Sequence, residues 1–85
     1  MRLDKFLWFV RVVKTRSSAQ DIAAGGHLRI DGRPTTRAHA DVRVGQVLSF
    51  PLHDKVCVLR VEALPTRRGP ASEAQACYTD LVASG

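Results

Sequence analysis

The feature that most constrains this chain is a change in the spacing of its apolar residues at Gly25–Gly26. Before these glycines, apolar side chains recur at steps of three and four, which predicts helices over residues 2–13 and 16–24. After them the spacing becomes two, and the alternation over 27–30 predicts a strand. A chain of 85 residues has room for one domain, so helices and strands must share one core.

Capping and turn residues mark the ends of these elements. Thr15 is a predicted N-cap because its hydroxyl can accept a hydrogen bond from a free N–H of the following helix. Gly25–Gly26 ends that helix, since a glycine adopts the left-handed conformation without strain. Asp31–Gly32 is typical of a tight hairpin turn, and Pro34 confines the returning strand over 33–36 to a sheet edge. Further strands are predicted over 47–50 and 55–64, with a turn over 51–54 between them.

Residues 65–85 predict a basic, turn-rich connector followed by a helix. The connector covers 65–70, and Ser72 is the predicted N-cap of a helix that extends to about Val82. The first predicted helix is apolar on two sides, so its Trp8–Phe9 side needs a cover. We expect the last helix to cover it, with Tyr78 in the contact.

Together these patterns predict an α+β fold, in which two N-terminal helices pack on a small, mostly antiparallel sheet and a short helix follows. We expect residues 1–64 to form the domain and residues 65–85 to form the connector and the C-terminal helix packed on it.

The positive charge lies in the N-terminal half of the chain. The formal net charge is +5, and residues 1–43 carry nine Lys or Arg against four Asp. A basic half on a small domain is typical of a nucleic-acid-binding protein. An arginine-rich surface of an ordinary soluble protein is the alternative interpretation.

The segment Lys14–Ser17 is the strongest candidate for anion binding. Free backbone N–H groups and the positive end of the helix dipole favour an anion at a helix start, and two cations and two hydroxyls accompany them here. His27, Arg29 and Arg33 lie on the outward side of the predicted hairpin and would extend the same basic surface. An ordinary capped helix with solvated charges explains the pattern equally well.

Several other functions find no support in the sequence. No apolar run is long enough to cross a membrane, and no signal-peptide pattern follows the apolar start. Cys57 and Cys77 are expected to be reduced thiols, and no histidine or cysteine spacing indicates a metal site. Because Ser17 and its neighbours have no paired base, we expect neither an enzyme nor a cofactor.

Four short motifs in order give the chain a resemblance to a known family, and they cover residues 2–7, 14–19, 25–32 and 44–46. This series resembles the αL RNA-binding motif, the domain named after small-subunit ribosomal protein S4, over residues 1–64. Within that superfamily, residues 2–8, 14–16 and 67–74 are similar to the ribosome-associated heat shock proteins of about fifteen kilodaltons.

The resemblance implies binding to large ribosomal subunits that still carry a nascent chain on tRNA, in rescue or recycling of stalled translation. We therefore expect a monomeric cytoplasmic protein that contacts ribosomal RNA and possibly peptidyl-tRNA. By the same resemblance, the two helices and the first hairpin contact RNA through Arg2, Lys5, Arg11, Lys14, Thr15, Arg16, Ser17, Gln20, His27, Arg29, Asp31 and Arg33.

Three alternatives stay open at the level of sequence. A DNA-binding helix-turn-helix regulator would place the helix over 16–24 in a major groove, although few of its side chains could reach bases. An RNA-modifying enzyme would need a catalytic domain after this one. A protein-binding adaptor would use the Trp8–Phe9 side.

Overall fold

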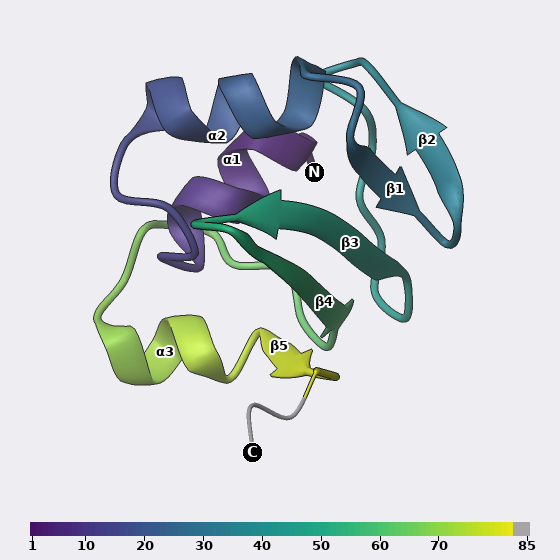
Figure 1. Ribbon diagram of the computed structural model, residues 1–85. Coiled ribbons are helices and arrows are strands. Elements are labelled where there is room, and N and C mark those ends of the chain that lie inside the picture. The colour runs from purple at the N-terminus through teal and green to yellow at the C-terminus, as the bar shows by residue number, and fades with distance from the viewer. Residues whose placement is uncertain (83–85) are drawn as a thin grey trace.

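The computed structural model describes residues 1–82 as two helices packed on one face of a five-stranded sheet, with a third, short helix near the C-terminus (Figure 1). The helices are α1 (Leu3–Phe9), α2 (Arg16–Ala24) and α3 (Ala71–Gln75). The strands are β1 (Leu28–Ile30), β2 (Arg33–Thr35), β3 (Val47–Leu52), β4 (Lys55–Val61) and β5 (Tyr78–Asp80). The predicted α+β class is confirmed.

Every strand pair is antiparallel, and the sheet order is β2-β1-β3-β4-β5. The predicted hairpin turn is present, because Asp31 and Gly32 both have positive φ angles, of 52° and 83°. β2 lies at the edge of the sheet, as predicted from Pro34. Proline has no N–H to donate, and at an edge strand this does not interrupt the hydrogen bonds of a central strand. The turn between β3 and β4 is tighter than predicted. His53 and Asp54 alone make it, so that Pro51 is the fifth residue of β3.

The core lies between α1, α2 and the inner face of the sheet. α1 contributes Leu3, Phe6 and Leu7, and Val10 follows directly after it; all four are at most 1% exposed. The facing strand residues alternate with exposed or half-buried ones, as period-two patterning requires. The fully or nearly buried strand residues are Leu28, Leu48, Phe50, Leu59 and Val61.

α1 ends at Phe9, four residues earlier than the predicted helix over 2–13. Arg11 takes a left-handed conformation (φ 60°) and its N–H donates to the Trp8 carbonyl, while the Val12 N–H donates to the Leu7 carbonyl. This pair of bonds is a Schellman motif, which satisfies carbonyl groups that a helix end leaves free. The Arg11 side chain then donates from Nε to the Gly69 carbonyl oxygen at 2.6 Å, so a distant segment holds the turn in place.

The prediction of a helix from Ser72 to about Val82 is wrong. α3 has five residues and begins after Pro70, and the chain then forms β5 against β4. Tyr and Thr are favourable in strands, and β5 satisfies backbone groups of β4 that would otherwise form an open edge. Residues 62–64 are likewise outside β4, which ends at Val61.

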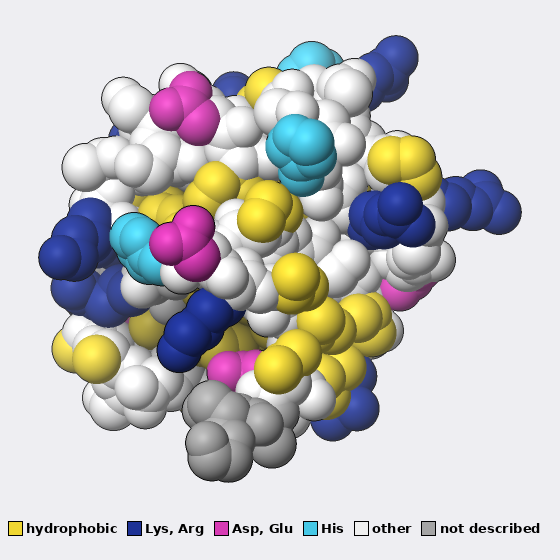
Figure 2. Space-filling model, in the orientation of Figure 1, with side chains coloured by type: hydrophobic (Ala, Val, Ile, Leu, Met, Phe, Trp, Pro, Cys, Tyr) yellow, Lys and Arg dark blue, Asp and Glu magenta, His cyan; other side chains and the backbone are white. Residues whose placement is uncertain are grey.

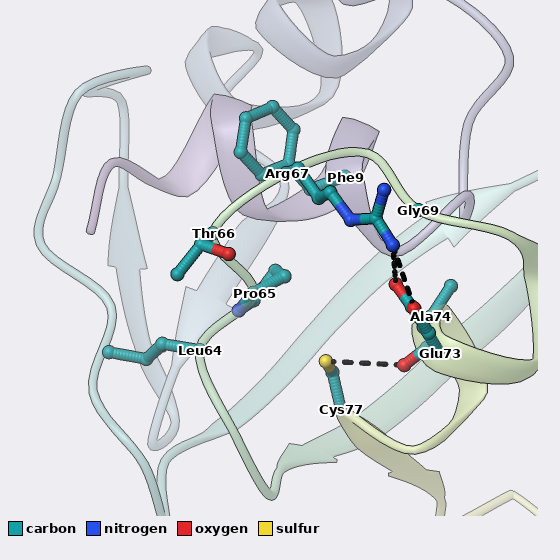
Figure 3. Close-up of a pocket in the computed structure, with 9 residues that line it drawn as sticks. All are labelled: Phe9, Leu64, Pro65, Thr66, Arg67, Gly69, Glu73, Ala74 and Cys77. Carbon is teal, nitrogen blue, oxygen red and sulfur yellow. Dashed lines mark hydrogen bonds and ion pairs between the residues drawn. The ribbon is translucent and has the colours of Figure 1, made fainter.

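The cover of Trp8 and Phe9 also differs from the prediction. Phe9 faces the C-terminal segment, in a pocket of about 210 Å³ that Leu64, Pro65, Ala74 and Cys77 also line (Figure 3). Figure 3 shows two interactions beside this pocket, the Arg67–Glu73 ion pair at 2.8 Å and the hydrogen bond from the Cys77 thiol to the Glu73 carbonyl. Tyr78 lies elsewhere, in β5 opposite Val61, and Trp8 contacts two arginines.

Candidate nucleic-acid interface

The N-terminus of α1 is organised by one buried carboxylate. Asp4 is 4% exposed, and its two oxygens accept hydrogen bonds from Arg2 Nε at 3.0 Å and Nη2 at 2.7 Å. Its Oδ1 also accepts from the Lys5 backbone N–H at 2.8 Å. Burial raises the pKa of Asp4, but the hydrogen bonds from Arg2 and Lys5, helped by the Gln20 side chain, outweigh it and lower the pKa overall. Arg2 is therefore held in one orientation with about half of its side chain exposed.

The start of α2 has the geometry that its sequence predicts. Thr15 Oγ1 accepts a hydrogen bond from the Ser18 N–H at 3.1 Å, which confirms the N-cap. The backbone N–H groups of Arg16 and Ser17 donate to no residue among 1–82, so they remain available to an anion. Lys14, Arg16 and Ser17 are exposed around them.

Arg68 is a candidate that the sequence analysis missed. Its guanidinium lies 5.2 Å from the centroid of the Trp8 ring, and the Arg16 guanidinium lies 5.5 Å from the same centroid. Arg68 Nε also donates to the Trp8 carbonyl oxygen at 3.1 Å. The signal that could have found it is the basic connector itself, Arg67-Arg68, but nothing in the spacing shows which of the two arginines meets α1.

The hairpin of β1 and β2 supplies the second part of the surface. His27, Arg29 and Arg33 are exposed. Asp31 has a structural role, because its Oδ1 accepts a hydrogen bond from the Val47 N–H at 2.8 Å and so ties the turn to β3. Asp31 therefore stabilises the hairpin that presents Arg29 and Arg33.

These groups form an elongated surface, with the start of α2 at one end and the hairpin at the other (Figure 1). A helix of nine residues is about 13 Å long, and Gln20 is exposed between its two ends. Figure 2 shows Lys and Arg side chains protruding at the left edge, beside the loop before α2, and at the right edge, over β1 and β2. Arg11 is also exposed, although its Nε is bonded to the Gly69 carbonyl oxygen of the connector.

Ion pairing separates the basic residues into two groups. Four of the 13 Lys and Arg side chains form ion pairs with Asp or Glu, and they are Arg2, Arg43, Arg60 and Arg67. The other nine form none with any residue among 1–82, and they are Lys5, Arg11, Lys14, Arg16, Arg29, Arg33, Arg37, Lys55 and Arg68. Six of the seven basic residues predicted to contact RNA belong to the second group. The unneutralised charge thus concentrates on the predicted surface.

Residues 1–82 contain neither a metal-binding cluster nor a helix able to span a membrane. No cluster of three His, Cys, Asp or Glu side chains able to hold a metal ion occurs there. None of the helices in that range has the length and apolar content that crossing a membrane requires.

Comparison with known proteins gives consistent results at the level of family, sequence and structure. The S4 domain model matches residues 1–48, which include α1, α2 and the β1–β2 hairpin. Heat shock protein 15 of Escherichia coli K12 is 31% identical over 84 residues, which is 99% of this chain and 62% of that protein. The RQC P-site tRNA stabilizing factor of Bacillus subtilis is 36% identical over 64 residues, which is 75% of this chain and 73% of that protein.

A solved structure supports the same relationship. Heat Shock Protein 15 of Vibrio cholerae superimposes with a TM-score of 0.87 and 29% identity, covering 96% of this chain and 82% of that one. That structure is described as trimeric, so the comparisons do not support the expectation of a monomer. The chain spans less than two thirds of the length of the Escherichia coli relative. From the matched helices and hairpin, and from the fold they share with this relative, we conclude that the chain belongs to the S4 domain family.

Proposed function

We propose that this protein docks on ribosomal RNA of the large ribosomal subunit and acts in rescue or recycling of subunits stalled with a nascent chain on tRNA. The observation that carries the proposal is the set of unneutralised cations on the helices and hairpin that match the S4 domain. Relatives named heat shock protein 15 and RQC P-site tRNA stabilizing factor point to a heat shock and ribosome quality control setting in the cytoplasm.

Docking is electrostatic, with recognition of RNA shape. Lys14 and Arg16 meet phosphates beside the free N–H groups at the start of α2, and Arg29 and Arg33 meet a second stretch of backbone. A double-stranded RNA presents its backbone and 2′-hydroxyls, because its major groove is too narrow for side chains to read. Thr15, Ser17, Gln20 and His27 lie between or beside the cations and add polar groups to the surface.

The role is one of binding, and we propose no catalytic residue. Asp4 is the buried carboxylate of the described residues, but its hydrogen bonds keep it ionised and bound to Arg2. A group held in this way is poorly suited to transfer protons.

The direct test is co-sedimentation with purified large ribosomal subunits, either empty or carrying peptidyl-tRNA. We expect binding to both, tighter to the subunits that carry peptidyl-tRNA. If about five phosphates are neutralised, log K should fall against log salt with a slope of roughly −3.5 to −4.5. Binding that barely changes with salt would contradict the electrostatic mechanism.

A pair of double variants tests the location of the surface. Lys14→Ala/Arg16→Ala should weaken binding to the subunit by at least tenfold without unfolding the domain, because it removes two unneutralised cations. Arg43→Ala/Arg60→Ala changes the net charge equally but removes cations already paired with Asp41 and Glu62, so it should have little effect. Equal losses in the two variants would refute the assignment.

A competition assay tests the DNA-binding alternative. Preference for duplex DNA over structured RNA in that assay would favour the helix-turn-helix alternative.

A further inference from the structure

The Trp8 ring brings together two arginines from distant parts of the chain. Arg16 is the first residue of α2, and Arg68 belongs to the connector before α3. Both guanidinium carbons lie within 5.5 Å of the Trp8 ring centroid, within the range of a cation–π interaction. Because both groups lie this close to the same ring centroid, the two guanidinium groups are also near each other.

The connector is fixed to α1 by two hydrogen bonds that run in opposite directions. Arg68 Nε donates to the carbonyl oxygen of Trp8 at 3.1 Å, and Arg11 Nε donates to the carbonyl oxygen of Gly69 at 2.6 Å. Gly69 is buried between them, and Arg68 is half-buried. Since its position is set before any ligand arrives, the Arg68 side chain loses little further freedom on binding.

Neither guanidinium on the Trp8 ring is neutralised by the part of the chain that the structure describes. No carboxylate of residues 1–82 forms an ion pair with Arg16 or Arg68, whereas the adjacent Arg67 is paired with Glu73 at 2.8 Å. Two like charges held near one ring repel each other, and an anion bound close to both would relieve that repulsion. Their planar, bidentate groups match the geometry of a phosphodiester.

We propose that Arg68 is an RNA-binding residue, which together with Arg16 holds a phosphodiester of the docked RNA beside the Trp8 ring. This inference rests on the proposed function and extends its surface beyond residues 1–48, which match the S4 domain. The connector thereby forms a third part of the surface, in addition to the start of α2 and the hairpin.

The chain offers a matched pair of substitutions and a local probe. Arg68→Gln and Arg67→Gln remove one charge each from adjacent positions of the connector, but of the two only Arg67 forms an ion pair with a residue among 1–82. Trp8 is the only tryptophan of the chain, so its fluorescence reports on this site alone. The assay is a titration with a short RNA hairpin, followed by Trp8 fluorescence and repeated at several salt concentrations.

We expect Trp8 fluorescence to change on RNA binding in the unmodified protein. Arg68→Gln should bind the hairpin roughly tenfold more weakly and reduce the salt slope by about one, because one phosphate contact is lost. Arg67→Gln should stay within about twofold of the unmodified protein. Arg68→Lys retains the charge but loses the bidentate group, so it should keep the salt slope and bind with an affinity between those of Arg68→Gln and the unmodified protein.

Three results would decide against the proposal. Equal affinities for Arg68→Gln and Arg67→Gln would show that Arg68 contacts no phosphate. A salt slope for Arg68→Lys that falls by about one relative to the unmodified protein would show that Arg68 acts only by holding the connector, and this comparison does not depend on Arg68→Gln folding. If the unmodified protein does not bind RNA at all, the proposed function itself fails, which is a different outcome from normal binding by Arg68→Gln.

Discussion

Replacing Asp4 by alanine should lower the free energy of unfolding by about 2 to 3 kcal/mol. The substitution leaves the Lys5 N–H in the first turn of α1 without its acceptor, a loss comparable to that of a helix cap, about 1 kcal/mol. It also removes both hydrogen bonds from Arg2. Because 47% of the Arg2 side chain is exposed, water can replace part of this pair, and we assign it about 1 to 2 kcal/mol rather than the full cost of breaking a buried pair.

Urea denaturation followed by circular dichroism measures this change. For a domain of this size, a loss of 2 to 3 kcal/mol corresponds to a decrease in Tm of roughly 10 to 20 °C. Asp4→Asn separates the contributions, since its amide oxygen can still accept from Lys5 while its NH₂ group faces the Arg2 guanidinium. We expect Asp4→Asn to be more stable than Asp4→Ala and less stable than the unmodified protein.

The matched control is Asp21→Ala, at an exposed carboxylate of α2 that forms no ion pair with residues 1–82. Its stability should stay within about 0.5 kcal/mol of the unmodified protein. If Asp4→Ala were as stable as this control, the hydrogen bonds of Asp4 would contribute nothing net, and the role assigned to it at the start of α1 would be refuted.

Two further predictions concern stability. The pKa of Asp4 is lower in the folded state, so the stabilisation by Asp4 is fully present above the unfolded pKa of about 3.9 and is lost as the pH falls through the folded pKa. Below about pH 4, urea midpoints should therefore fall more steeply with decreasing pH for the unmodified protein than for Asp4→Ala. Parallel curves for the two proteins would contradict this. Gly32→Ala should cost about 1 kcal/mol in the same assay. The cause is the φ of 83° at Gly32 and not a steric clash, since an added Cβ would meet no atom within 4 Å. Gly32→Asn should cost less, because Asn tolerates positive φ better than Ala. An unchanged stability in Gly32→Ala would show that the turn relaxes.

The structure shows which of the predicted RNA-contacting residues already have partners within the protein. The sequence places Arg2, Arg11 and Arg16 in the same basic half, but it does not show which of them the protein itself engages. Arg2 is held by Asp4 and Arg11 by the Gly69 carbonyl, whereas the Arg16 guanidinium lies over the Trp8 ring. These differences arise because the partner of each arginine depends on how the chain packs and not on the order of its residues.

Interactions within a few residues determined the parts of the fold that the sequence could predict. The change of period at Gly25–Gly26, the Thr15 cap and the Asp31–Gly32 turn each depend on neighbouring residues, and all three are present in the structure. Local propensity and patterning act over such short distances, so they can be read without knowledge of the rest of the chain.

Tertiary structure decided the features whose partners lie far away in the sequence. The C-terminal pattern favours a helix, yet Tyr78–Asp80 forms a strand because β4 presents open backbone groups to it. α1 stops at Phe9 with Gly69 holding the turn, and Arg68 reaches Trp8 across 60 positions of sequence. A sequence pattern records what each segment prefers alone, whereas the hydrogen bonds and charges that a distant segment brings become available only once the chain has folded.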